Sequence, residues 1–237
     1  MSGDKKQAKK VISSGNAELD GRMGGGLPRG TLGLIEGNSG SGKSVLSQQI
    51  MWGALQDGYT VSLFSSENSV KSLVPQMSSI DLDIMEFLLL GKFRVYPVEF
   101  SHLGDNAVNE LIQAMKRENE YSRDLIVVDS LTSAIIHTTH EQSILNFFEE
   151  AKRLCAQGVT ILVTLHNQAV ASDIVGSIRS MCDAHINLKA EQDGQKLVKI
   201  LEVAKIRGAA SVTGDIVGFD VEPGWGMRVI PISKARG

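Results

Sequence analysis

The octapeptide GNSGSGKS, Gly37 to Ser44, decides how this chain is expected to fold. It matches the pattern G-x-x-x-x-G-K-S/T in full, between an apolar run, Leu32–Ile35, and a helical pattern, Ser44–Gln56. A strand, a glycine-rich loop and a helix in this order are typical of a loop that binds phosphate groups. The sequence therefore predicts a nucleotide-binding α/β protein.

Each residue type in this loop has a chemical role. Glycines let backbone N–H groups turn inward around a phosphate, and the helix N-terminus adds a favourable partial charge. Lys43 can reach the β- and γ-phosphates of ATP, and the Ser44 hydroxyl can ligate Mg²⁺. We expect Lys43 to lie exposed on the loop. The predicted nucleotide contacts are Gly37, Asn38, Ser39, Gly40, Ser41, Gly42, Lys43, Ser44 and Val45.

A carboxylate follows another strand candidate. The run DLIVVDS, Asp124 to Ser130, has four apolar residues and then Asp129. At the end of that strand Asp129 can hold Mg²⁺, through water, opposite Ser44. The alternative role for Asp129 is to cap a helix.

Apolar segments alternate between strand-like and helix-like periods, which predicts a mostly parallel sheet sandwiched by helices. Each strand candidate is a compact apolar run, as expected where both faces of a sheet are covered. The strand candidates are Leu32–Ile35, Val61–Phe64, Phe93–Tyr96, Leu125–Val128 and Val159–Thr164, and the helical patterns are Ser44–Gln56, Val70–Leu89, Asn106–Glu118 and Glu141–Ala156.

The pattern changes after His185, where two hairpin signals predict antiparallel strands appended to the parallel sheet. The first pairs Ile186–Ala190 with Leu197–Val203 across Glu191–Gly194, and the second pairs Ile216–Val221 with Met227–Ile232 across Pro223–Gly226.

Composition limits the possible classes of function. With 237 residues, 42% of them hydrophobic, residues 1–237 are predicted to form one domain with residues 1–10 as a flexible tail. Lys and Arg total 24 against 27 Asp and Glu, so there is no overall basic footprint for nucleic acid. The apolar run FLLLG, Phe87 to Gly91, is far shorter than the ~18 residues of a membrane helix. We expect a cytoplasmic protein that reaches a membrane only through partners.

The run LDGRMGGGLPRGTLGLIEGNSGSGKS, Leu19 to Ser44, resembles the RecA/KaiC branch of P-loop ATPases. The segments SSENSVKSL, KIRG at Lys205–Gly208 and GWGMRVIPISK narrow the resemblance to the KaiC-like ATPases of the archaellum, the archaeal motility filament. It extends from Val11 to Lys234. The resemblance implies a RecA-like core that binds ATP, in a homo-oligomeric ring, expected to be a hexamer. It also implies contacts with the assembly ATPase and the membrane platform protein of the motor.

Glu67 is the candidate general base for hydrolysis. It follows a strand expected beside the nucleotide strand, where a base could orient the attacking water. KaiC-type domains place two adjacent carboxylates here, whereas this sequence has Ser66 and then Glu67. A structural hydrogen bond is the alternative role for Glu67. The missing carboxylate predicts slow or conditional hydrolysis.

His166, in TLHNQ, stands where RecA-like proteins carry a sensor of the γ-phosphate. Asn167 and Gln168 are alternatives for that role, and His166 could instead be an ordinary hydrogen-bonding residue.

Lys205 and Arg207 alternate along a strand end, which places both side chains on one face. In KaiC-like rings the matching Lys-x-Arg reaches the nucleotide of the neighbouring subunit. Solvated charges on an edge strand are the alternative interpretation. Thr132 and Ser133, just after Asp129, are candidates for phosphorylation as in KaiC.

Together these features predict an ATP-binding, ring-forming regulatory and assembly component of the archaellum motor. Two alternatives stay open, a RecA/RadA-paralogue DNA-dependent ATPase and a KaiC-like signalling autokinase. The segment His166–Asp173 has no Lys, Arg or aromatic residue, which disfavours direct binding of nucleic acid. Phosphopeptide mapping after incubation with ATP would identify an autokinase.

Overall fold

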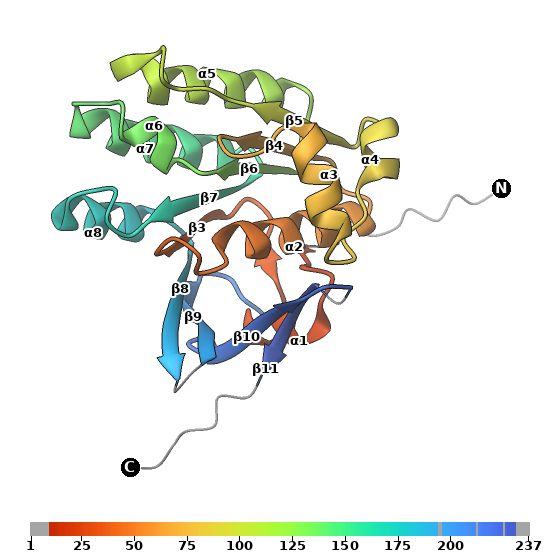
Figure 1. Cartoon of the computed structure of the whole chain (residues 1–237). Coiled ribbons are helices and arrows are strands. Elements are labelled where there is room, and N and C mark those ends of the chain that lie inside the picture. The colour runs from red at the N-terminus through yellow and green to blue at the C-terminus, as the bar shows by residue number, and fades with distance from the viewer. Residues whose placement is uncertain (1–9, 194–195, 212, 225, 231–237) are drawn as a thin grey trace.

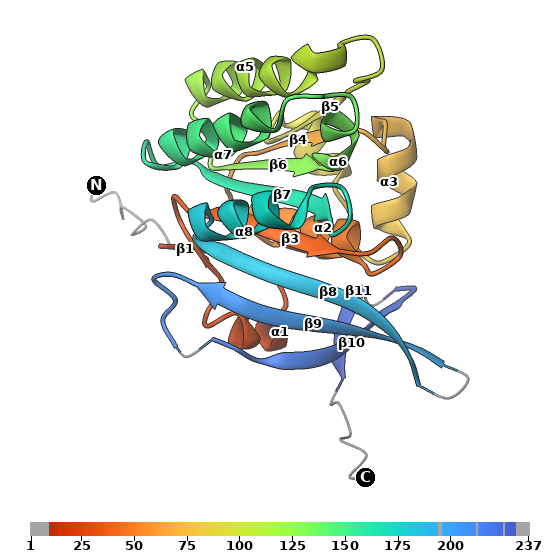
Figure 2. The same cartoon turned by 90° about the vertical axis from the view of Figure 1, so that its left-hand side faces the viewer.

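The computed structural model describes residues 10–193, 196–211, 213–224 and 226–230. Its centre is a nine-stranded sheet with the strand order β11-β10-β9-β8-β3-β7-β6-β4-β5 (Figures 1 and 2). A separate two-stranded sheet pairs β1 (Val11–Ile12) with β2 (Leu27–Pro28). The strands of the large sheet are β3 (Leu32–Gly37), β4 (Val61–Ser65), β5 (Phe93–Pro97), β6 (Leu125–Asp129), β7 (Thr160–His166), β8 (Ala184–Asp193), β9 (Lys196–Ile206), β10 (Ile216–Glu222) and β11 (Gly226–Ile230).

Neighbouring strands pair in parallel through one part of the sheet, which in spatial order is β8, β3, β7, β6, β4 and β5. This parallel part confirms the predicted fold class. The register places Gly37 of β3 opposite His166 of β7, and Ser65 of β4 opposite Asp129 of β6. The carboxyl ends of these four strands therefore meet at one edge of the sheet, where open α/β sheets bind ligands.

Helices cover both faces of the parallel sheet (Figure 1). One apolar cluster packs α2 and α3 on one face, and a second packs α5, α7 and α8 on the other. No helix within the described part of the chain is long and apolar enough to cross a membrane. The helices are α1 (Ala17–Arg22), α2 (Lys43–Gln56), α3 (Val70–Ser78), α4 (Met85–Leu89), α5 (Ala107–Glu120), α6 (Thr132–Ile135), α7 (Glu141–Cys155) and α8 (Ser172–Met181), with a 3₁₀ turn at Gly104–Asn106.

The helical pattern over Val70–Leu89 is two helices instead of one. Asp81 lies between α3 and α4 with φ 62°, a left-handed conformation that cannot continue a right-handed helix. Leu82 and Ile84 then turn inward and are buried in the core. Sequence periodicity also did not predict the shorter elements α1, α6, α8, β1 and β2.

Both predicted hairpins are confirmed. β8 pairs in parallel with β3 on one side and antiparallel with β9 on the other, so it joins the two parts of the sheet. β10 continues the antiparallel part and pairs with β9 and β11. Several predicted positions lie outside the described residues, namely Gly194, Trp225, Pro231, Ile232 and the tail residues 1–9.

Candidate functional site

The loop between β3 and α2 has the strand–loop–helix context predicted for phosphate binding. Gly40 and Gly42 have φ of 74° and 98°, the left-handed region that glycine adopts without strain. A Cβ atom on Gly37 would lie 2.4 Å from the carbonyl oxygen of Leu188, so the backbone here also needs the space of a glycine. The Ser41 hydroxyl in this loop is buried and makes no hydrogen bond with the described residues. An unpaired buried donor fits a loop that receives a polar ligand.

The expectation that Lys43 lies exposed on the loop is wrong. Lys43 is the first residue of α2 and only 7% exposed. Its Nζ donates hydrogen bonds to the carbonyl oxygens of Gly37 at 3.0 Å and Asn38 at 2.8 Å, because the loop folds back over the ammonium group. Burial lowers the pKa of Lys43, and the charges of Asp129 and Glu67 oppose that shift.

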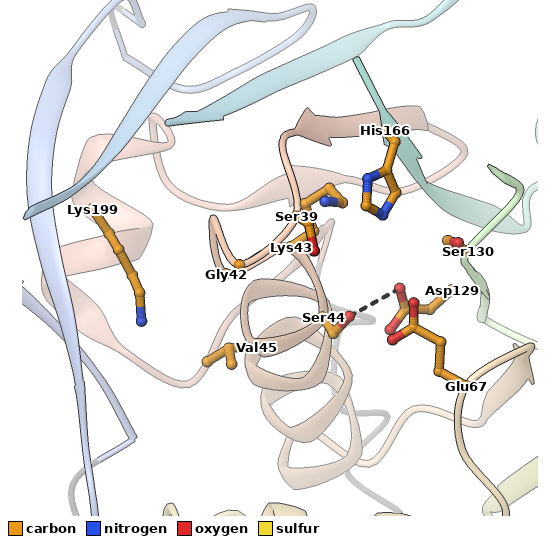
Figure 3. A pocket seen from close by; sticks show the side chains of 11 residues that line it. Ser39, Gly42, Lys43, Ser44, Val45, Glu67, Asp129, Ser130, His166 and Lys199 are labelled. Atoms are coloured by element: carbon orange, nitrogen blue, oxygen red, sulfur yellow. Dashed lines mark hydrogen bonds between the residues drawn. The ribbon is translucent and has the colours of Figure 1, made fainter. Parts of the chain in front are cut away.

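Asp129 ends β6 and faces the start of α2. Its Oδ1 accepts hydrogen bonds from the hydroxyls of Ser44 at 3.2 Å and Thr164 at 2.7 Å (Figure 3). Burial raises the pKa of Asp129, while these two hydrogen bonds lower it by less. A divalent cation would favour the ionised carboxylate. Ser44 and Asp129 thus present two oxygen ligands suited to Mg²⁺, whose remaining ligands would come from phosphates and water.

Glu67 lines the same pocket from the loop after β4. Figure 3 shows its carboxylate beside that of Asp129 and directed toward Ser44. Ser66, at the position of the missing carboxylate, instead connects two loops. Its hydroxyl accepts a hydrogen bond from the backbone N–H of Ser130 at 3.3 Å and lies 2.8 Å from the Ser133 hydroxyl oxygen.

His166 ends β7 beside the phosphate loop and its side chain lines the pocket (Figure 3). Burial lowers the pKa of His166, and the neighbouring charge of Lys43 lowers it further. The two alternatives, Asn167 and Gln168, lie in the following turn and are not among the described residues that line the pocket. Of the three candidates for the γ-phosphate sensor, His166 is therefore the best placed to contact a ligand in the pocket.

The pocket has a volume of about 240 Å³ and spans both sides of the phosphate loop. Glu67, Asp129 and His166 line one side, whereas Val45 and Lys199 line the other (Figure 3). A nucleotide with its terminal phosphate near the carboxylates would extend its nucleoside toward Val45 and Lys199.

Lys199 was not identified from the sequence. It is half-buried in β9 and pairs across the sheet with Phe219 of β10. A Cβ on Gly42 would lie 2.9 Å from the Phe219 ring, so these antiparallel strands pack directly on the loop. Alternation along β9 places Lys199 on the same face as the buried residues Leu201 and Val203. This alternation is the signal in the sequence that points Lys199 inward.

Lys205 and Arg207 lie away from the phosphate loop of their own chain. Lys205 pairs with His185, which is level with Leu34 of β3 and about 10 Å along the strand from the loop. Its Nζ donates a 2.6 Å hydrogen bond to the carbonyl oxygen of Arg179 in α8. Arg207 Nη1 lies 3.7 Å from Asp183 Oδ1. Both side chains therefore gather near the carboxyl end of α8, at the amino edge of the parallel sheet.

Thr132 and Ser133 lie at the start of α6, and their hydroxyls are used locally. The Thr132 hydroxyl accepts a 3.0 Å hydrogen bond from the backbone N–H of His166, while the Ser133 hydroxyl pairs with Ser66. Neither is among the described residues that line the pocket.

A charged cluster around the buried carboxylate of Glu36, the residue before Gly37, adjoins the loop. Glu36 is fully buried, and Arg179 of α8 donates to both of its carboxylate oxygens, with Nε 3.2 Å from Oε2. His185 Nε2 lies 3.1 Å from Oε1. Burial alone would raise the pKa of Glu36, but His185 and Arg179 together lower it by more.

Comparison with known proteins gives one family and close structural matches. The family model described as "ATPase: KaiC" matches residues 12–234. The archaeal flagellar ATP-binding protein FlaH of Sulfolobus acidocaldarius is 32% identical, over 95% of this chain and 99% of that protein. The crystal structure of the flagellar accessory protein FlaH from Methanocaldococcus jannaschii matches with a TM-score of 0.82 and 27% identity, over 93% of this chain and 98% of that one. A KaiC-like protein from Pyrococcus horikoshii, 22% identical with a TM-score of 0.77, shares the fold.

Proposed function

The chain belongs to the KaiC family of ATPases, and on that premise we propose that it is a nucleotide-dependent assembly switch of the archaellum motor. The observation that carries the proposal is the grouping of Lys43, Ser44 and Asp129 around one glycine-rich loop. Two of the similar proteins bear names that link ATP binding or an accessory role to the archaeal flagellum. That link and the site together favour this motor over other settings.

Mg-ATP is the proposed ligand. The loop would hold the phosphates with its backbone N–H groups and Lys43, and Ser44 and Asp129 would hold the cation. When bound, Mg²⁺ neutralises phosphate charge. Val45 and Lys199 would flank the nucleoside side of the ligand.

Hydrolysis is proposed to be slow in the isolated protein. In the loop after β4, Glu67 is the carboxylate that lines the pocket. The neighbouring Ser66 is instead hydrogen-bonded to Ser130 and Ser133. A single base can orient water, but Ser66 stands where KaiC-type domains carry the second of two adjacent carboxylates. Turnover is therefore expected well below the ~1–100 per second common for kinases.

A ring, expected to be hexameric, would complete the site. Lys205 and Arg207 lie on the opposite edge of the sheet from the phosphate loop, so contact with a nucleotide requires a neighbouring subunit. A site completed in this way binds ATP better in the ring, and by linkage ATP must favour the ring equally. We further propose that the ring works in the cytoplasm, against the assembly ATPase and membrane platform protein of the motor.

Light scattering after size exclusion, with and without Mg-ATP, combined with phosphate release on the same sample, tests this function. We expect Mg-ATP to shift the protein from small species to a ring with little phosphate released. A protein that stays monomeric with saturating ATP and turns over rapidly would refute the switch. Stimulation of phosphate release by single-stranded DNA would favour a DNA-dependent ATPase.

A further inference from the structure

The helix α4 carries exposed apolar side chains that the nucleotide site does not use. Leu89 is 81% exposed and Met85 45%, and Leu90, the residue that caps the end of the helix, is 62% exposed. Together with Glu86, which shares their side of the helix, these residues form what we call the α4 surface. It contains Leu89 and Leu90 of the apolar run that is too short for a membrane helix.

The exposure of the α4 surface is fixed by packing on the opposite side of the helix. Phe87 and Leu88 are half-buried and pack against the core cluster that includes α2. The helix is further anchored by Asp83, whose carboxylate accepts a 2.9 Å hydrogen bond from the backbone N–H of Met85. With Phe87 and Leu88 turned inward, Leu89 and Leu90 must face outward. Single exposed leucines are common on proteins, but adjacent ones on a fixed helix mark an interaction surface.

The α4 surface lies on the side of the molecule away from the phosphate loop. α4 ends at Leu89, shortly before β5 begins at Phe93, so it stands at the amino edge of the parallel sheet. The loop follows the carboxyl end of β3. Figure 1 shows α4 at the margin of the molecule beside α3. A partner could therefore bind this surface while the nucleotide site is filled.

Charges around the α4 surface indicate the chemistry of its partner. Asp81, Asp83 and Glu86 are exposed within and just before the helix, and Lys92 follows it half-buried. This acidic excess would repel an anionic membrane surface. It would also repel the same surface of a second copy in a two-fold dimer, because both copies carry the same charges. A segment that combines apolar side chains with Lys or Arg is complementary to both the apolar side chains and the acidic charge of the α4 surface.

We propose that the α4 surface binds an amphipathic helix of a partner protein whose apolar face is flanked by basic residues. Leu89 and Leu90 supply the apolar contact, and Glu86 with its acidic neighbours sets the charge preference. This docking site is separate from nucleotide binding and does not depend on the proposed motor function.

A pair of synthetic helices tests the proposal on the full chain. One labelled peptide of about fourteen residues presents leucines flanked by lysines, and its twin carries glutamates in place of the lysines. Fluorescence anisotropy measures binding to wild type, to Leu89→Ser with Leu90→Ser, and to the control Ile136→Ser, another exposed apolar residue that is 67% exposed. All substituted positions are exposed, and circular dichroism verifies that each variant folds.

We expect wild type and Ile136→Ser to bind the lysine peptide at least ~tenfold more tightly than the glutamate twin. The Leu89 and Leu90 double variant should lose at least ~tenfold in affinity for the lysine peptide. Glu86→Lys should reduce the preference for lysine over glutamate.

Several results would overturn the proposal. Equal binding of the two peptides, or equal losses in the double variant and Ile136→Ser, would show that the α4 surface is not selective. Leucine-dependent binding to anionic lipid vesicles would assign the surface to a membrane. A leucine-dependent dimer in light scattering would assign it to a second copy of the chain.

Discussion

Replacing Lys43 with alanine should separate nucleotide binding from folding. Without nucleotide, the Lys43 ammonium donates hydrogen bonds to the carbonyl oxygens of Gly37 and Asn38. These bonds are already charge-assisted by the ammonium, and ATP would replace their neutral acceptors with two charged phosphate oxygens, which brings a second, opposite charge to each bond. At about 1–1.5 kcal/mol gained for each exchanged bond, Lys43→Ala loses about 2–3 kcal/mol of binding free energy. That loss is a rise of ~30- to 150-fold in Kd.

The fold of Lys43→Ala should survive because two effects on stability oppose each other. The substitution removes two hydrogen bonds, which stabilise the loop in the absence of nucleotide. It also removes a charge whose burial is unfavourable, as the lowered pKa of Lys43 indicates. Alanine has a high helix propensity at this first position of α2. We expect the free energy of unfolding to change by less than about 1 kcal/mol, which shifts the melting temperature by at most ~2–4 °C.

Isothermal titration calorimetry with Mg-ATP measures the affinity, and thermal melting by circular dichroism measures the stability. Lys189→Ala is a matched control, since it removes a lysine that pairs with Glu202 in β9 and is absent from the pocket lining. Unchanged affinity in Lys43→Ala would refute the assignment of the loop. Equal losses in Lys43→Ala and Lys189→Ala would show a general effect of charge instead.

Four further variants test the rest of the site. Asp129→Asn should weaken ATP binding more with Mg²⁺ than without it in calorimetry, whereas equal losses would indicate a capping role. Burial raises the pKa of Asp129, so the ionised carboxylate destabilises the folded state as pH rises through that pKa. Asp129→Asn should therefore melt at a higher temperature than wild type at about pH 8, but not at about pH 4, in scanning calorimetry. Glu67→Gln should retain ATP binding and ATP-promoted oligomerisation while phosphate release falls at least ~tenfold, and unchanged release would exclude Glu67 as the base. Lys205→Ala with Arg207→Ala should keep ATP binding but lose most ATP-promoted oligomerisation by light scattering, and a ring of normal stability would contradict this. Lys199→Met should weaken ADP and ATP binding by about the same factor of ten in calorimetry, whereas a loss for ATP alone would place Lys199 at the terminal phosphate.

The carboxyl edge of the sheet could be predicted because each of its parts is determined locally. The spacing of GNSGSGKS sets the loop, and the apolar run before Asp129 sets the strand that ends there. A parallel arrangement then brings the strand ends together without further information, and the register of Gly37 with His166 confirms it. The position of Lys43 was predicted, but its burial was not, since the carbonyl groups that surround it come from the backbone of the loop.

Features that depend on which strands lie side by side could not be predicted. Lys199 reaches the pocket because β9 and β10 lie over the phosphate loop, and neither periodicity nor a motif fixes that placement. The break between α3 and α4 was missed for a different reason. The apolar pattern continues through both helices, whereas the turn at Asp81 depends on one left-handed residue that is not glycine.

The ion pair between the buried Glu36 and the exposed Arg179 links the evolution of two distant parts of the chain. Losing Arg179 alone would leave a fully buried carboxylate without the guanidinium that holds both its oxygens, at a cost of about 3 kcal/mol. Replacing both residues with apolar ones of similar size would cost far less. Among homologous sequences, positions 36 and 179 should therefore vary as a pair. A lineage that changes the end of α8 must also change the residue that precedes its phosphate loop.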